Sequence, residues 1–342
     1  MLLVLLGCTP ITLPVDTTEP ADTNLETGGD TEDTEDTDTW EPGPLPYPTV
    51  DYDCSAVPDD PEAYDNKVLS GARAWHGMAF SPEGELIGWD GWNTIKKTKY
   101  EDDARSWLPG YSGVEQIVQH PNGDLYTSLL DRGEVVRLTP EGGAERLTSN
   151  LLFAYGMTQR PDGKFWVADG HLSVLDPETG EMERLLSGDD NWNGEYDLYR
   201  DVQLNLDSTK LYVVKAGVTG SVMYVTDVDE DLNLVGELEP FVELPGYWKD
   251  GVQVDACGYL WVPDYQYYAL YRISPDGEIL TVLSTPEIGY GHGTEWGNGV
   301  GGWREDAIYI PLPYNDAKVR ELVIGVPDGR FVRTWKGQKS WY

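Results

Sequence analysis

The sequence predicts an all-β protein, a six-bladed β-propeller with four antiparallel strands in each blade. The first observation is a unit of two short apolar strands around a tight turn, which recurs six times. The second is the absence of any run of apolar residues with helical spacing longer than two turns. Because one such unit cannot bury its apolar face alone, we expect successive units to pack into a ring. The turns fall 39 to 50 residues apart, at Gly84, Gly123, Gly163, Ser208, Gly258 and Asp306.

Each unit contributes an inner pair of strands, and three units show a clear outer hairpin as well. Pro-Asp-Gly and Pro-Glu-Gly turns, which favour tight reversals, join many of these strands. We place the propeller domain at residues 48–342 and the repeat itself at about 65–330. The inner pairs are 78–80 with 86–87, 117–118 with 125–126, 157 with 165–167, 202–206 with 211–214, 252–254 with 260–262, and a last pair ending in 308–310. The outer hairpins are 135–147, 174–186 and 270–283.

The first eight residues predict a lipoprotein signal. Residues 1–6 are apolar, and Leu5-Leu6-Gly7-Cys8 resembles the bacterial lipobox, in which a small residue precedes the cysteine that receives lipid. The apolar run is short and no basic residue precedes it, so we expect the true start to lie upstream of Met1. An ordinary signal, or an unmodified Cys8, is the alternative.

Residues 9–47 predict a disordered, acidic linker. Between Asp16 and Glu41 there are eleven acidic residues and no basic one, and such a composition buries too little apolar area to fold. Directly after a lipid-bearing cysteine, this segment indicates a tether that holds the propeller away from a membrane. Thr9 follows the cysteine in place of the Asp that commonly retains lipoproteins in the inner membrane. We therefore expect a bacterial outer-membrane lipoprotein that faces the periplasm or the exterior.

The charge and the cysteines narrow the partners and the compartment. The formal net charge of −36 excludes nucleic acid as a partner, since phosphate binding needs a basic face. The same charge favours a soluble monomer. An oxidising envelope permits a disulfide between Cys54 and Cys257, and two free thiols are the alternative.

Residues just before each innermost strand of a propeller meet at the mouth of its central channel. Counting eight residues back from each turn selects one residue in every blade, and all six are polar or amphipathic. Such convergence predicts a ligand site at the mouth. The alternative is that these side chains solvate the channel and hydrogen-bond one another. The six are His76, Glu115, Tyr155, Arg200, Asp250 and Asn298.

The segment 249–262 resembles the signature of the senescence-marker-protein/gluconolactonase family, and 155–167 follows the same pattern more loosely. The resemblance implies a six-bladed propeller with a divalent cation at the channel mouth. The metal-binding Asp of the family falls on Asp250, followed by Gly251. The Asn-Gly motif of the family aligns with Arg200-Asp201 in this sequence. The family's Asn-Asp-Gly motif aligns with Tyr155-Gly156, and the Glu of its first blade aligns with His76.

One of the three implied ligands, Asp250, is thus kept. A guanidinium cannot ligate a cation and repels one. Asp201, His76, Glu115 and Asn298 would complete a different ligand set at the mouth.

Residues 189–197 predict a second metal site. They fit the D-x-[DN]-x-[DN]-G core of a calcium-binding loop, with an acid at the ninth position. Position twelve is Arg200, so the loop is not an EF-hand. We expect a structural Ca²⁺ here, and an acidic turn without an ion is the alternative. The ligands would be Asp189, Asn191, Asn193, Asp197 and the carbonyl of Glu195.

Aromatic and histidine residues outside the repeat add candidates. Rings such as Trp248 and Trp296 stack on sugars or pack between blades. His292 lies in a Gly-rich segment before the sixth blade, and with His76 it is a candidate general base or metal ligand.

Two functions follow. The first is an envelope-anchored propeller that binds a small polar, sugar-like ligand or a cell-surface partner at the mouth. The second is a metal-dependent lactonase or hydrolase, or more distantly an enzyme of the streptogramin-lyase type, with His76 or His292 as the base and Asp250 among the metal ligands.

Overall fold

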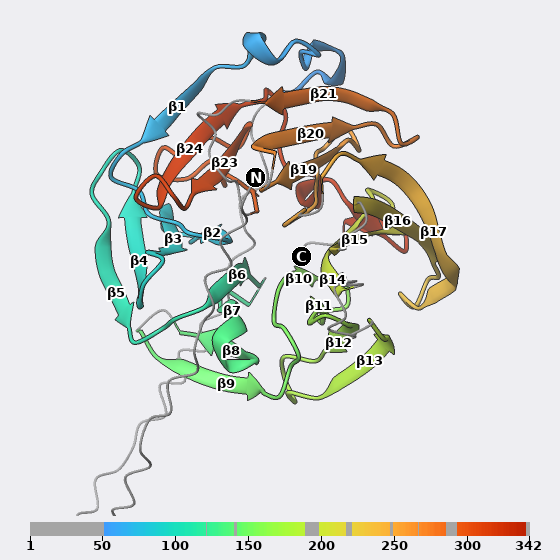
Figure 1. Cartoon of the computed structure of the whole chain (residues 1–342), viewed down its shortest axis with the longest axis horizontal. Coiled ribbons are helices and arrows are strands. Elements are labelled where there is room, and N and C mark those ends of the chain that lie inside the picture. The colour runs from blue at the N-terminus through green and yellow to red at the C-terminus, as the bar shows by residue number, and fades with distance from the viewer. Residues whose placement is uncertain are drawn as a thin grey trace, which may run out of the picture. The chain divides into compact units, whose positions relative to one another are not determined.

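The structure is a computed structural model that describes residues 51–120, 122–139, 142–188, 198–216, 221–246, 249–265, 267–284 and 293–339. Six four-stranded antiparallel sheets surround a central axis, as Figure 1 shows. The predicted six-bladed propeller with four strands per blade is confirmed. No helix in these ranges is long and apolar enough to cross a lipid bilayer.

Five blades are continuous in sequence, and each consists of four consecutive strands. Blade one contains β2 (Met78–Phe80), β3 (Glu85–Trp89), β4 (Thr94–Lys99) and β5 (Arg105–Pro109). Blade two contains β6 (Val114–Gln119), β7 (Leu125–Leu129), β8 (Glu134–Leu138) and β9 (Ala144–Thr148). Blade three contains β10 (Met157–Gln159), β11 (Phe165–Ala168), β12 (Leu172–Leu175) and β13 (Met182–Leu186). Blade four contains β14 (Leu198–Leu204), β15 (Lys210–Ala216), β16 (Ser221–Val228) and β17 (Leu234–Leu244). Blade five contains β18 (Gln253–Val254), β19 (Leu260–Asp264), β20 (Ala269–Ile273) and β21 (Ile279–Ser284).

The sixth blade closes the ring with a strand from the other end of the repeat. Its first three strands are β22 (Glu295–Trp296), β23 (Ala307–Leu312) and β24 (Lys318–Val323), and its outer strand is β1 (Asn66–Leu69). β1 pairs antiparallel with β24, with Asn66 opposite Leu322. This pairing joins the N-terminal end of the repeat to the last blade and so closes the ring.

The core lies between the blades. The second strands of blades two, three, five and six are buried along their whole length, so they occur in the sequence as apolar runs. Trp166 and Trp261 are fully buried in two of these strands. Trp296, for which the sequence analysis left ligand stacking or packing between blades open, belongs to the same core: it is fully buried, and its indole N–H donates to the Val326 carbonyl at 2.9 Å. Its candidate role in ligand binding is therefore wrong, and packing is the alternative that holds.

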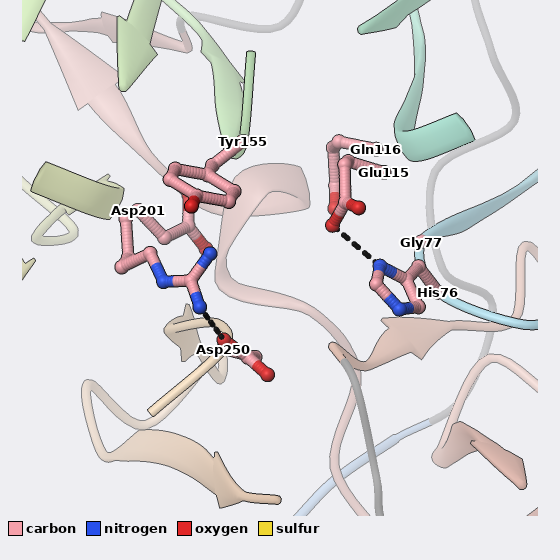
Figure 2. A pocket seen from close by; sticks show the side chains of 9 residues that line it. His76, Gly77, Glu115, Gln116, Tyr155, Asp201 and Asp250 are labelled. Carbon is pink, nitrogen blue, oxygen red and sulfur yellow. Dashed lines mark hydrogen bonds and ion pairs between the residues drawn. The ribbon is translucent and has the colours of Figure 1, made fainter. Parts of the chain in front are cut away.

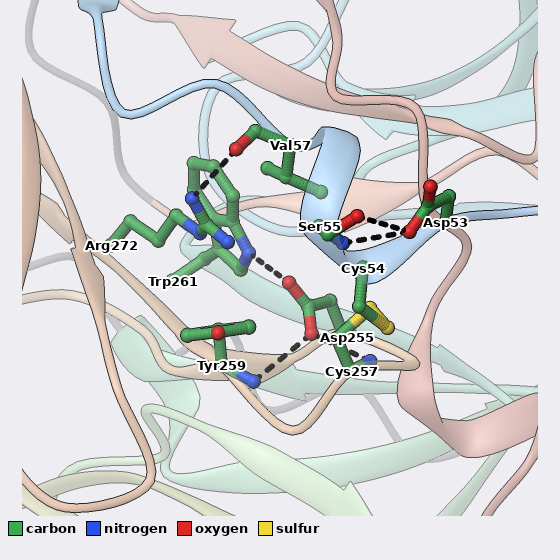
Figure 3. Close-up of a disulfide and its surroundings, with 9 residues drawn as sticks. All are labelled: Asp53, Cys54, Ser55, Val57, Asp255, Cys257, Tyr259, Trp261 and Arg272. Carbon is green, nitrogen blue, oxygen red and sulfur yellow. Dashed lines mark hydrogen bonds between the residues drawn. A yellow bond between two sulfur atoms is a disulfide. The ribbon is translucent and has the colours of Figure 1, made fainter.

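Segments from outside the repeat cover the turn between β18 and β19. On the N-terminal side, η1 (Cys54–Ala56) carries Cys54, which forms a disulfide with Cys257 of that turn, as Figure 3 shows. η2 (Pro61–Ala63) follows it. The Asp255 carboxylate in the turn accepts hydrogen bonds from the Trp261 indole and two backbone N–H groups. Burial raises its pKa to about 6.

The C-terminal segment meets the same turn. Residue 328, next to η4 (Gly329–Phe331), forms an antiparallel bridge with Asp255, and the Ala256 N–H donates to the Pro327 carbonyl at 2.8 Å. Phe331 is buried. Beyond η4, the short strands β25 (Thr334–Trp335) and β26 (Gln338–Lys339) form a hairpin. A further short helix, η3 (Leu130–Arg132), follows β7.

Candidate functional site at the channel mouth

The mouth is the end of the central axis at which the innermost strands β2, β6, β10, β14 and β18 begin. A small cavity of about 20 Å³ lies there, with room for one or two water molecules. Five of the six side chains that the sequence analysis placed at the mouth line it, one from each of blades one to five (Figure 2). The lining residues are His76, Gly77, Glu115, Gln116, Tyr155, Gly156, Arg200, Asp201 and Asp250.

Two of these side chains lie at irregularities of the innermost strands. The pairing of β6 with β7 shifts register between Val114 and Ile117, and Glu115 lies within that shift. The pairing of β14 with β15 shifts between Tyr199 and Asp201, which brackets Arg200. Bulges of this kind redirect a side chain that would otherwise point into a sheet face. Local backbone irregularity therefore helps to aim both groups at the cavity.

Close contacts between neighbouring blades fix the backbone beneath these side chains. The Gly77 N–H donates to the Glu115 carbonyl at 2.6 Å, and the Gly156 N–H donates to the Arg200 carbonyl at 2.8 Å. A Cβ atom at Gly156 would lie 2.4 Å from the Arg200 carbonyl oxygen, and one at Gly77 would lie 2.7 Å from the Glu115 carbonyl oxygen. Only glycine permits this approach, so the glycine that follows His76 or Tyr155 positions the charged residue of the next blade.

His76 and Glu115 form the first charged pair. The His76 Nδ1 atom and a Glu115 carboxylate oxygen are in hydrogen-bond contact, and both side chains are less than one-fifth exposed. When the imidazole is neutral, donation from Nδ1 to Glu115 leaves the lone pair on Nε2. This arrangement orients the ring and makes Nε2 the atom that takes up a proton.

Arg200 and Asp250 form the second pair. Asp250 lies across from His76 and Glu115 in Figure 2. The guanidinium Nη2 lies 3.3 Å from an Asp250 carboxylate oxygen, and the two side chains are 11% and 12% exposed, so solvent screens the pair only partly. The guanidinium carbon also lies 3.7 Å from the centre of the Tyr155 ring, which adds a cation–π contact. Tyr155 in turn stacks on Phe153. Arg200 is thus held between an aromatic ring and a carboxylate.

Asp201 lies behind this pair. Its two carboxylate oxygens accept hydrogen bonds from the backbone N–H groups of Val202, at 2.8 Å, and Val252, at 2.9 Å. Burial raises the pKa of this carboxyl to about 7, and the hydrogen bonds oppose that shift only in part. Asp201 therefore ties blade four to blade five, and both of its oxygens already have protein donors.

The support for Asp250 includes an ion pair that the sequence analysis missed. Lys249 and Asp264 are fully buried, with Nζ 2.5 Å from the carboxylate, and Nζ also donates to the Pro245 carbonyl at 2.5 Å. The pair joins the residue before Asp250 to the end of β19. The sequence feature that could have indicated this pair is a lysine in the segment that leads into the innermost strand β18. A lysine is rarely buried without a partner of opposite charge.

Asn298 does not lie at the mouth, so this part of the prediction is wrong. Its amide donates to the Ser81 carbonyl at 2.8 Å, beside a second small cavity that Phe80 and Gln119 line where β2 and β6 end. The turn between β22 and β23 is much longer than the corresponding turn between β18 and β19. Counting eight residues back from Asp306 therefore selects a residue that follows β22, whereas the mouth residues of the other blades lie near or before the start of the innermost strand.

Several predicted site residues lie outside the described ranges. They are Cys8, the calcium-loop residues Asp189, Asn191, Asn193, Glu195 and Asp197, and Trp248 and His292.

The mouth residues do not fit a divalent cation. Among the residues that the structure describes, no three His, Cys, Asp or Glu side chains are grouped so as to hold one. The reason is local: Arg200 lies against Asp250, the one implied ligand that is kept, and Glu115 is engaged with His76. Asp201, the other carboxyl considered, accepts from two backbone N–H groups.

Comparison with known proteins places this geometry in context. Residues 157–290 match the family model of the SMP-30/gluconolactonase/LRE-like region, as the resemblance of segment 249–262 predicts. No curated protein sequence matches the chain.

Solved structures with the same fold share little sequence with the chain. A gluconolactonase from Xanthomonas campestris is 17% identical, with a TM-score of 0.65 over 82% of this chain and 99% of its own. The calcium-binding protein regucalcin from Agrobacterium tumefaciens is 13% identical, with a TM-score of 0.61 over 81% and 97%. Virginiamycin B lyase from Staphylococcus aureus is 15% identical, with a TM-score of 0.52 over 76% and 98%. The chain is thus a six-bladed β-propeller, and its residues 157–290 are similar to the SMP-30/gluconolactonase/LRE-like region.

Proposed function

We propose that this propeller binds a small, polar, sugar-like ligand at the mouth of its channel. The observation that carries the proposal is the convergence of one polar or amphipathic side chain from each of five blades on a single cavity. A few convergent polar groups around a concavity are the usual features of a small-molecule site. Alternatively, the same site would bind a cell-surface partner that inserts a polar group into the mouth.

The chemistry of the lining favours a ligand rich in oxygen atoms. Arg200 supplies N–H donors, Asp250 and Glu115 supply acceptors, and the Tyr155 ring offers a face for stacking. The cavity itself is small, so a sugar-sized molecule would lie above the two charged pairs and place one group between them.

The location in the cell and the calcium site belong to the same proposal. Lipid on Cys8 and the acidic linker 9–47 would hold the propeller, as a monomer, at the bacterial outer membrane. A structural Ca²⁺ in loop 189–197 would stabilise the connection from blade three to blade four.

A hydrolytic or lyase function is the second candidate, and one observation favours it. The His76–Glu115 pair has the arrangement of a general base and the carboxylate that orients it, and the guanidinium of Arg200 lines the same cavity. His76 would take up a proton at Nε2, and Arg200 would donate to a developing oxygen anion. The described mouth residues do not fit a metal ion, so this chemistry would rest on these side chains alone.

The test is ligand binding to the full chain, with glucose, gluconate and glucono-1,5-lactone as probes. We expect a probe to raise the melting temperature, and Tyr155→Ala to weaken its binding at least about tenfold, since the ring and the Arg200 contact are both lost. Trp92→Ala is the matched control, because Trp92 is an aromatic residue that is 80% exposed and does not line the mouth. Equal binding by the wild type and Tyr155→Ala, or no binding of any probe, would contradict the proposal.

The same samples separate binding from catalysis. Acid release from the lactone above the spontaneous rate, lost in both His76→Ala and Glu115→Gln, would support the second candidate. Binding without such release would leave the first.

A further inference from the structure

We infer that the guanidinium of Arg200 takes the place of a divalent ion beside Asp250 and supplies the positive charge of the mouth. The site then binds neutral, oxygen-rich ligands without a metal. This inference rests on the proposed ligand site at the mouth and adds how that site obtains its positive charge.

The first step is the position of the guanidinium. Arg200 lies at the strand position that faces Asp250, and its Nη2 atom is 3.3 Å from that carboxylate. At this separation, in a site that is only about one-tenth exposed, a fixed positive charge strongly disfavours a second cation at the same carboxylate. A divalent ion would have to displace Arg200 before it reached Asp250.

The second step is that Arg200 is held in place by more than its charge. Its carbonyl oxygen accepts from the Gly156 N–H, and its guanidinium stacks on Tyr155, which stacks on Phe153. The close approach at Gly156 leaves the backbone no room to shift toward blade three. Displacing the guanidinium would therefore break contacts with two neighbouring blades.

The third step concerns the remaining carboxylates. Glu115 is in contact with His76, and Asp201 accepts from two backbone N–H groups. A hard divalent cation needs several oxygen ligands at once. While Arg200 occupies Asp250, the cation would have to compete for every carboxylate of the site, whereas removal of the guanidinium would free Asp250 to nucleate a ligand set.

The charge balance then indicates the ligand class. Arg200 neutralises Asp250, so that side of the cavity offers donors and acceptors without a net charge. Glu115 on the opposite side disfavours an anion unless His76 is protonated. A neutral ester, lactone or sugar, whose oxygens accept from the guanidinium, fits this balance better than a carboxylate does.

The test is calorimetric titration of the full chain with Ca²⁺, in four forms. These are the wild type, Asp250→Ala, Arg200→Asn, and the double variant of both. Asp250→Ala isolates the mouth, because a calcium site elsewhere in the chain is the same in every form. We expect the wild type and Asp250→Ala to bind equal numbers of ions. Arg200→Asn removes the guanidinium and adds an amide oxygen, so it should gain about one ion per chain, which the double variant should lose again.

Two results would overturn the inference. One is an ion that the wild type binds and Asp250→Ala does not. The other is an Arg200→Asn protein that folds, by circular dichroism, and gains no ion. If Arg200→Asn does not fold, Arg200→Gln keeps most of the side-chain length and removes the charge, and the same two criteria apply to it.

A separate measurement distinguishes failure of this inference from failure of the proposed function. Binding of the most effective of the three probes is compared with and without a chelator, in the wild type and in Asp250→Ala. Binding by the wild type that survives chelation supports a metal-free site, and chelator-sensitive binding that depends on Asp250 contradicts it. The absence of any probe binding would refute the ligand site while leaving the metal titration interpretable.

Discussion

The two ends of the central channel are both lined by charged side chains, but different parts of the chain build them. At the mouth, the charges come from the blades themselves, at the positions where the innermost strands begin. At the far end, where these strands finish, Arg330 and Arg333 come from the C-terminal segment outside the repeat. Arg330 lies 2.5 Å from Glu295, and Arg333 donates to the Gln203 side chain at 3.0 Å.

Two residues of the C-terminal segment are more completely buried than the charged pairs of the mouth, whereas Arg330 is 18% exposed. Phe331 and Arg333 are at most 4% exposed, and Gln203 donates to Gln253 in the same hydrogen-bonded chain. The two charged pairs of the mouth keep 11% to 17% exposure around a cavity of about 20 Å³, and the far end has a cavity of about 40 Å³. Because the C-terminal segment anchors the far end, we propose that this end mainly stabilises the fold while the mouth binds the ligand, and variants at either end test this division.

The largest effect is expected from removing the apolar anchor of the far end. Phe331→Ala should lower the free energy of unfolding by about 3–5 kcal/mol, because it leaves a cavity under η4. Urea unfolding followed by fluorescence measures this change. Trp92→Ala, at an exposed position, should change the same quantity by less than about 0.5 kcal/mol. Equal losses in the two variants would show that η4 does not anchor the far end.

The disulfide should have the next largest effect, again on stability. Cys54 and Cys257 are 203 residues apart, so their bond restricts a long loop of the unfolded chain. The double variant Cys54→Ala/Cys257→Ala should lose about 2–5 kcal/mol, while binding of a ligand at the mouth stays within about twofold.

The control for this prediction uses reductant. Thiol should lower the melting temperature of the wild type toward that of the double variant, and it should leave the double variant unchanged. A wild type that does not respond to reductant under unfolding conditions would mean that the bond does not form in the protein.

The comparison also separates what the sequence could predict from what it could not. Repeat spacing predicted the ring and five of the residues at its mouth, because the turns between the first and second strands have similar lengths in blades one to five. The same count failed in blade six, where a longer turn moved Asn298 away from the mouth. Trp296 was misassigned because an aromatic residue in a two-residue strand gives no periodicity from which burial can be read.

Other features depend on contacts between distant segments, which local patterns do not encode. The pairing of β1 with β24 and the covering of the far end by η4 are of this kind. So is the burial of Lys249 against Asp264. At the mouth, the identity of Arg200 indicated that a cation would be repelled, but its contact with both Tyr155 and Asp250 required the structure.

The smallest effect, taken over one pH unit, is a pH dependence of stability that originates at the mouth, in Asp201. Burial raises the pKa of this carboxyl from 3.8 to about 7, so the folded protein holds a proton that the unfolded chain releases at lower pH. Its contribution to stability is therefore complete below about pH 4 and is lost as the pH rises toward 7, by at most about 1.4 kcal/mol per pH unit. Asp201→Asn removes the titration, so its free energy of unfolding should decline less steeply across this window, although its overall stability is lower because one backbone hydrogen bond is lost. Urea unfolding at several pH values measures the slope, with Asp231→Asn, an exposed carboxyl 78% accessible, as the control. Identical slopes for the wild type and Asp201→Asn would show that Asp201 is ionised in the folded state, and that the mouth carries one more negative charge than the charge balance proposed for its ligand allows.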